Sequence, residues 1–256
     1  MSEQRIVMRQ PEWPASSVLR ELLIGGAGLM LLVGVLHLTY MAPALLYPVA
    51  GGVYLVLATI MMWGWPAGQQ GLGWANRVTL TRALPIVLLT AMLPLPGFIN
   101  EHHLLVFGMA LTALALDGVD GWVARHAHCE SRFGARLDME LDAFFILMLC
   151  LMMVIQDKAG FWIMAIGAMR YLFVAAAWGC SWLGEELPVS YRRKTICVWQ
   201  VSTLMTCLTP WVTPPWSNLA LALALLLLVI SFAMDIVYLY RGAVARQNCT
   251  FNRGRR

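Results

Sequence analysis

Long apolar stretches constrain this chain more than any other feature of its sequence. A membrane-spanning helix needs about 20 mainly apolar residues, and stretches of that kind recur between residues 22 and 240. Of the 256 residues, 60% are hydrophobic and 12% are charged, whereas a soluble domain carries about 25% charged residues. We therefore expect an all-α, polytopic membrane protein. The same composition excludes a soluble globular enzyme, a secreted disulfide scaffold and a disordered regulator.

The apolar stretches predict eight membrane spans, grouped as two plus six. The first two form a hairpin whose glycines, such as Gly25 and Gly26, permit close helix packing, and a glycine-rich break at 64–73 follows it. We expect a cytoplasmic arm and extra hairpin over 1–73, a six-helix core over 74–240 and a basic cytoplasmic tail over 241–256. The predicted spans are 22–40, 43–65, 83–99, 104–125, 134–156, 160–183, 195–213 and 217–240.

Lysine and arginine residues orient these spans. One set of loops and the tail are rich in them, whereas the opposite set of loops holds only Lys158. Because cytoplasmic loops carry an excess of Lys and Arg, we expect an integral protein of a bacterial inner membrane with both termini in the cytoplasm. This distribution also accounts for the net charge of +4, so we expect membrane lipids and no nucleic acid as partners.

Two consecutive spans carry aspartates at their cytoplasmic ends. Asp117 and Asp120 lie near the end of one span, and Asp138 and Asp142 lie near the start of the next. An aspartate at the centre of a membrane helix is disfavoured by about 2.5–3.5 kcal/mol, so such residues normally mark function. A short loop, 126–133, lets the two helices face each other. Four converging carboxylates repel one another unless cations compensate them, and oxygen ligands favour Mg²⁺, Mn²⁺ or Ca²⁺ over Zn²⁺.

The residues between these aspartates suggest what the metal site does. Gly121 and Gly134 lie on the faces that bear the acids and leave the backbone open to a bulky ligand. Arg125 follows Gly121 by one turn and offers a guanidinium fork to phosphate oxygens. Glu140 lies two residues from the nearest aspartates, hence on another helix face. Metal ions beside an arginine and bare backbone indicate phosphoryl-type transfer.

The segment from Asp117 to Asp142 resembles the signature of the CDP-alcohol phosphatidyltransferase family. Every fixed position of the pattern Asp-x2-Asp-Gly-x2-Ala-Arg-x8-Gly-x3-Asp-x3-Asp is present. The segment from Asn76 to Arg82 is similar to the Asn/Thr/Arg segment that precedes the first core helix of this family. The resemblance covers roughly 74–240, and the family's six-helix core matches the last six predicted spans.

This resemblance implies a reaction and a set of site residues. An alcohol oxygen would attack the phosphorus that bears the lipid of CDP-diacylglycerol, with CMP leaving, and Asp142 would be the catalytic base that deprotonates the alcohol. Two divalent ions, Mg²⁺ or Mn²⁺, would be shared by Asp117, Asp120, Asp138 and Asp142. The CDP donor would be bound by Gly121, Arg125, Ser131, Asn76, Thr79 and Arg82. We also expect a homodimer.

The acceptor alcohol is less constrained by the sequence. Arg170 is an intramembrane cation, which is costly unless it pairs with an acid or binds a phosphate. Bacterial family members that use glycerol 3-phosphate have an arginine in a similar place. Tyr171 and Ala143 depart from those members, which have a glutamate and a lysine at these positions. A second basic cluster could contact an acceptor phosphate or anchor the loop at the membrane surface: Arg192, Arg193 and Lys194.

A phosphorylated alcohol, with glycerol 3-phosphate as the best candidate, is therefore the expected acceptor in phospholipid biosynthesis. Two alternatives stay open: the same family chemistry with inositol, serine or choline, and a non-enzymatic cation or proton transporter that uses its acids as a relay. Asp235, in the last span, is expected to reach the interface or to pair with Arg241.

Overall fold

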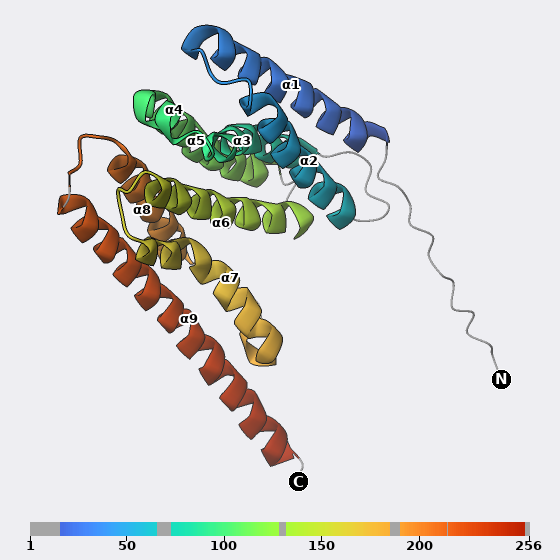
Figure 1. Cartoon of the computed structure of the whole chain (residues 1–256). Coiled ribbons are helices and arrows are strands. Elements are labelled where there is room, and N and C mark those ends of the chain that lie inside the picture. The colour runs from blue at the N-terminus through green and yellow to red at the C-terminus, as the bar shows by residue number, and fades with distance from the viewer. Residues whose placement is uncertain (1–15, 66–72, 128–131, 185–189, 214, 254–256) are drawn as a thin grey trace. The chain divides into compact units, whose positions relative to one another are not determined.

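A computed structural model of the chain describes residues 16–65, 73–127, 132–184, 190–213 and 215–253. These described residues form nine α-helices and two short 3-10 helices, and they contain no strand (Figure 1). The predicted all-α class is confirmed. Four helical segments in the described part are long and apolar enough to cross a membrane, namely Ser17–Tyr40, Leu46–Gly64, Phe161–Gly179 and Trp216–Val244.

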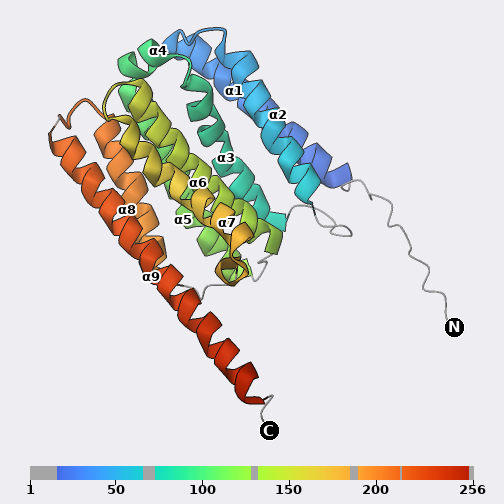
Figure 2. The same cartoon turned by 60° about the horizontal axis from the view of Figure 1, so that its bottom comes forward.

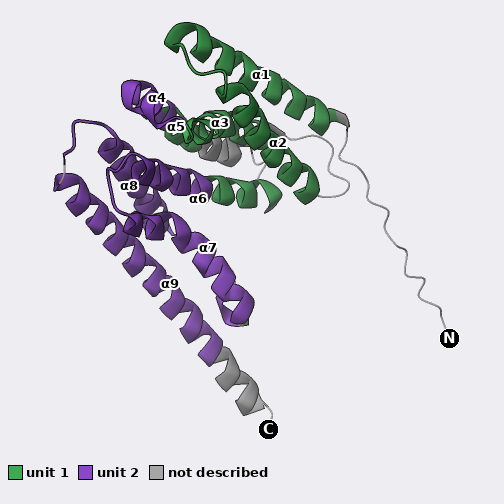
Figure 3. Cartoon of the chain, in the orientation of Figure 1, with its two compact units in different colours: residues 1–94, 112–141 green, residues 95–111, 142–256 purple. Residues whose placement is uncertain are grey.

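The chain divides into two compact units, which Figure 3 shows in green and purple. Two of the three boundaries fall inside helices, α5 (His103–Ala127) and α6 (Arg132–Ile155), each of which begins in one unit and ends in the other; the third lies between residues 94 and 95. The first unit comprises residues 1–94 and 112–141, and the second comprises residues 95–111 and 142–256.

In the first unit, α1 (Ser16–Tyr40), α2 (Leu46–Gly64) and α3 (Gly73–Met92) pack against one another (Figures 1 and 2). Tyr54 of α2 crosses to α1, where its hydroxyl donates a hydrogen bond of 2.5 Å to the carbonyl of Leu22. A Cβ atom on Gly25 would lie only 2.6 Å from this hydroxyl. The glycine therefore permits the close packing that the sequence predicts for the hairpin.

In the second unit, α8 (Tyr191–Leu208) runs beside α9 (Trp216–Arg253) in both views (Figures 1 and 2). The buried side chain of Gln200 links them, because its Nε2 donates to the carbonyl of Ala224 at 2.5 Å. The helix α7 (Met164–Gly179) approaches α6 at Gly167, where a Cβ atom would lie 2.7 Å from the Cα of Leu147. Only glycine fits at that distance.

Several predicted spans differ from the observed helices at their ends. The span expected over 83–99 is wrong at its end, because α3 stops at Met92 and a separate short helix, α4 (Pro96–Glu101), follows it. Pro94 and Pro96 explain the break. Proline disfavours helical backbone at the residue before it, which ends α3, and it is favoured in the first turn of a helix, where Pro96 begins α4. Helix α9 continues well beyond the predicted end at 240, since a helix does not need to stop where its apolar part stops.

Candidate functional site

Three polar side chains line one side of α3. Asn76, Thr79 and Arg82 are spaced by three residues, as a shared helix face requires, and all are buried, with exposed fractions of 4%, 5% and 1%. A buried arginine is rare unless it is paired. The partners of Arg82 therefore decide what this helix contributes to a site.

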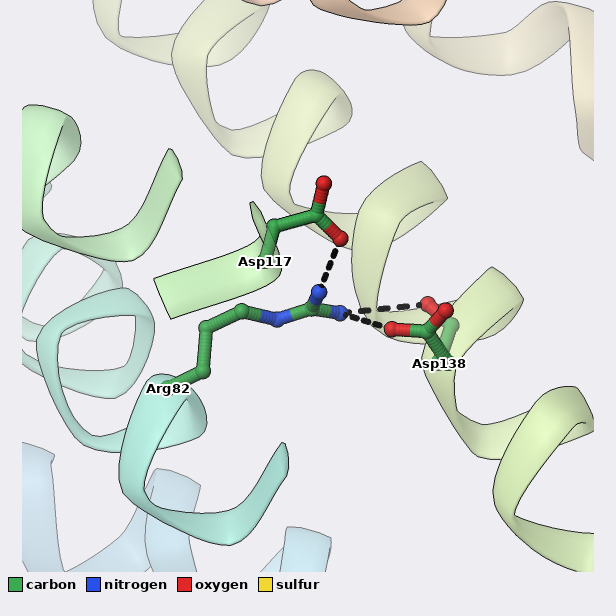
Figure 4. A network of polar contacts seen from close by, with 3 residues as sticks. All are labelled: Arg82, Asp117 and Asp138. Carbon is green, nitrogen blue, oxygen red and sulfur yellow. Dashed lines mark hydrogen bonds and ion pairs between the residues drawn. The ribbon is translucent and has the colours of Figure 1, made fainter. Parts of the chain in front are cut away.

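Arg82 lies between two of the predicted metal ligands (Figure 4). Its Nη1 donates a short hydrogen bond to Oδ1 of Asp117 on α5. Its Nη2 lies 2.7 Å from Oδ1 of Asp138 on α6 and 3.4 Å from the carbonyl oxygen of the same residue. One guanidinium thus holds carboxylates from two helices, and α3, α5 and α6 meet at a single charged cluster within the first unit.

Asp142 extends this cluster along α6. It follows Asp138 by four residues in one continuous helix, so it lies about one turn further along the same face. Asp117, Asp138 and Asp142 each offer a carboxylate oxygen, and these oxygens lie within 4.8 Å of one another. Oxygen ligands of Mg²⁺ or Ca²⁺ lie about 2.0–2.6 Å from the ion, so two ligand oxygens on opposite sides of one ion lie about 4–5 Å apart. The three carboxylates therefore fit a hard divalent cation.

The charge balance supports the same interpretation. Three carboxylates face one guanidinium, and the carboxylates are only partly exposed, with 22% of the Asp117 side chain and 38% of the Asp138 side chain accessible. Neighbouring carboxylates repel one another, and a cation at the partly exposed side of the cluster would relieve this repulsion.

Four predicted site residues fall where the structure gives no description. Asp120, Gly121 and Arg125 belong to the last turns of α5, but the structure describes nothing of their surroundings. Ser131 lies outside the described residues altogether. Their predicted roles in metal and donor binding stay predictions.

The predicted acceptor residues lie in the second unit. Arg170 is a half-buried residue of α7, and Arg193 and Lys194 lie in the first turn of α8, half-buried and exposed respectively. Arg192 is engaged within the protein: its Nη2 lies 2.5 Å from Oδ1 of Asp235, and its Nη1 donates to the carbonyl of Ser231 at 3.2 Å.

This ion pair corrects one expectation. Asp235 is buried and pairs with Arg192 of the neighbouring helix, and not with Arg241 of its own helix. The packing of α8 on α9 brings the two residues together, and no spacing along the sequence reveals that packing.

Sequence reasoning also missed the ion pairs of Arg82. The resemblance assigned this residue to the CDP donor, a role that stays a prediction, and the structure shows in addition that it pairs with Asp117 and Asp138. One signal was available, because an arginine at the edge of an apolar span needs a counter-charge. The aspartates of the motif are acidic residues that could supply it.

Fold and site together define the class: an integral membrane protein of helices with a carboxylate cluster suited to a divalent cation. The model of the CDP-alcohol phosphatidyltransferase family matches residues 72–237. The chain belongs to this family, whose members catalyse phosphatidyl transfer in phospholipid synthesis. Neither curated proteins nor solved structures yield a match to the chain.

Proposed function

We propose that this protein transfers the phosphatidyl group of CDP-diacylglycerol to a small polar alcohol and releases CMP. The observation that carries the proposal is the convergence of Asp117, Asp138 and Asp142 within 4.8 Å inside the region that matches the family. The complete Asp-x2-Asp-Gly-x2-Ala-Arg-x8-Gly-x3-Asp-x3-Asp pattern supports it. A transporter would not need this pattern, so the transferase is the favoured function.

The aspartates would hold the metal ions of the reaction. We assign Asp117, Asp120, Asp138 and Asp142 to two ions, Mg²⁺ or Mn²⁺, in line with their oxygen-only chemistry. When bound, such ions supply charge stabilisation for the phosphoryl oxygens and the leaving group.

The protein's own residues would position and activate the substrates. Arg82 fixes the carboxylates of Asp117 and Asp138, so that the cluster is formed before a ligand arrives. Asp142 accepts the proton of the acceptor hydroxyl. The acceptor oxygen then forms a bond to the phosphorus that bears the lipid, and the bond from this phosphorus to the CMP oxygen breaks. We assign donor binding to Gly121, Arg125, Ser131, Asn76, Thr79 and Arg82.

Our proposal for the acceptor is glycerol 3-phosphate or another phosphorylated alcohol. Arg170, Arg193 and Lys194 offer positive charge for such a phosphate in the second unit. Arg192 is a further candidate, and its guanidinium also pairs with Asp235. Inositol, serine and choline are the alternative acceptors.

The arrangement in the membrane completes the proposal. We propose eight spans, of which the first two belong to a hairpin over 1–73 that precedes the catalytic core over 74–240. Both termini, the basic tail over 241–256 and the active site would face the cytoplasm of a bacterial inner membrane, according to the distribution of Lys and Arg. We also propose that the protein is a homodimer.

The test is CMP release by the purified protein. CDP-diacylglycerol is supplied with Mg²⁺ or Mn²⁺, and glycerol 3-phosphate, inositol phosphate, inositol, serine and choline are added singly. We expect acceptor-dependent release that Asp142→Asn abolishes. Glu140→Gln is the matched control, because this exposed carboxylate lies on the same helix but on another face. Absence of release with every acceptor, together with cation flux in liposomes, would favour the transporter and overturn the proposal.

A further inference from the structure

A second polar site lies at the opposite end of α6 from the aspartates. The turn after α6 lines a cavity of about 320 Å³ within the second unit. Gln156 follows Asp142 by fourteen residues, which corresponds to about 21 Å along a helix. The cavity is therefore separate from the carboxylate cluster. It is lined by Asn100, His103, Gln156, Asp157, Lys158 and Cys207, together with Pro210, Val212, Thr213 and Ser217.

A rigid turn presents two of the lining residues. Asp157 has a left-handed backbone, with φ of 53°. The amide of Asp157 donates to the carbonyl of Val154 at 3.1 Å, and the amide of Lys158 donates to the carbonyl of Met153 at 3.0 Å. These two bonds form a Schellman motif, the hydrogen-bonded turn that closes many helices. Gln156 and Lys158 are thus held in place by the end of α6.

Lys158 brings the positive charge. Its ammonium donates to the carbonyl of Leu208, the last residue of α8. An ammonium has three donor hydrogens, so this contact leaves two for a further ligand. Burial lowers the pKa of Lys158, and the nearby thiol of Cys207 opposes this effect. Asp157, which also lines the cavity, is the acidic residue next to this ammonium in the chain.

Two further polar groups in the lining have unused hydrogen-bonding capacity. Within the described residues, Nε2 of Gln156 and Oγ of Ser217 are buried without a hydrogen-bond partner. The exposed fraction of Ser217 is only 1%. Leaving a buried polar group unpaired costs about 1–3 kcal/mol, so a partner inside the cavity would be stabilising. The amide nitrogen of Gln156 can only donate, and it therefore requires an acceptor.

We propose that this cavity binds a phosphate-type oxyanion, which Lys158, Gln156 and Ser217 hold through charge-assisted and neutral hydrogen bonds. An oxyanion supplies several acceptors at once and compensates the ammonium, which a neutral polyol does not. The volume of about 320 Å³ exceeds what a phosphate group alone occupies. The phosphate could belong to a lipid headgroup or be free in solution, and the experiment distinguishes these sources.

The test is isothermal titration calorimetry on the full-length protein in detergent, with EDTA to keep divalent metals from the aspartates. The three probes are inorganic phosphate, dihexanoyl phosphatidic acid and dihexanoylglycerol, which lacks phosphate. Binding of both phosphate compounds identifies a general phosphate site, and binding of phosphatidic acid alone identifies a headgroup site. Either result supports the proposal, provided that dihexanoylglycerol does not bind.

Variants assign the binding to this cavity. Lys158→Gln should weaken binding about tenfold, as the loss of one charge-assisted hydrogen bond implies. Ser217→Ala should weaken it several-fold without lowering the melting temperature, because the hydroxyl has no partner in the described part of the chain. Arg77→Gln and Ser202→Ala are the matched controls, since both residues are exposed and lie outside the cavity. Absence of binding, or unchanged binding in both cavity variants, would overturn the proposal.

Discussion

Replacing Arg82 by glutamine removes the guanidinium that joins Asp117 and Asp138. The arginine side chain is 1% exposed, whereas the two carboxylates are 22% and 38% exposed. Removing one partner of a fully buried ion pair costs about 3–5 kcal/mol. Because water reaches both carboxylates, we expect the lower end, about 3 kcal/mol, for the metal-free protein. For a chain of this size about 2–4 °C of melting temperature corresponds to 1 kcal/mol, so the melting temperature should fall by roughly 6–12 °C.

Divalent metal should reverse most of this loss. A cation bound by the aspartates supplies the counter-charge that the variant lacks, so Mg²⁺ or Mn²⁺ should raise the melting temperature of Arg82→Gln more than that of the unmodified protein. Unfolding can be followed with a thiol-reactive fluorophore, because Cys150 and Cys207 are buried in the folded protein. Measurements with EDTA and with saturating metal give the two values needed.

Arg77→Gln provides the matched control. Arg77 lies on the same helix and forms an ion pair of 2.6 Å with Glu21, but 47% of its side chain is exposed. Glu21 is only 17% exposed, so this variant should lose about 1 kcal/mol, but it should respond to metal like the unmodified protein, because the pair lies apart from the aspartates. If Arg82→Gln lost the same stability with and without metal, the guanidinium would have only a packing role, and the reasoning would be refuted.

Three further variants test the packing. Gly167→Ala places a methyl group against the backbone of α6 at Leu147. Such overpacking should destabilise the protein by about 1–3 kcal/mol, which a lower melting temperature would show. An unchanged melting temperature would contradict the close approach of α7 and α6. Arg192→Gln leaves the buried carboxylate of Asp235 without its arginine and should lower the free energy of unfolding by about 2 kcal/mol. Adding Asp235→Asn should restore much of this loss in a double-mutant cycle. Additive losses would show that the two residues do not interact. Tyr54→Phe removes one hydrogen bond to α1 and should cost about 1 kcal/mol, with no loss expected if the contact does not form.

Hydropathy predicted the all-α class correctly, because membrane insertion requires long apolar helices, but only four of the eight predicted spans correspond to described segments that are long and apolar enough to cross a membrane. The four segments that could cross a membrane lie in α1, in α2, in α7 with the 3-10 turn before it, and in α9, and each overlaps a predicted span. The end of α3 was predicted wrongly, since hydropathy does not register that Pro94 and Pro96 interrupt a helix. Hydropathy averaged over about 20 residues does not locate a helix end that is set by a single residue.

The sequence alone determined the family and the grouping of the carboxylates, because fixed spacing along two consecutive helices places Asp117, Asp138 and Asp142 on facing sides. Only the tertiary structure decided the partners of the arginines. Arg82 reaches aspartates 35 and 56 residues away in the chain, and Arg192 reaches Asp235, 43 residues away. Such pairs form where helices pack, and that packing depends on the shapes of both helix faces at once, which no local pattern in the sequence contains.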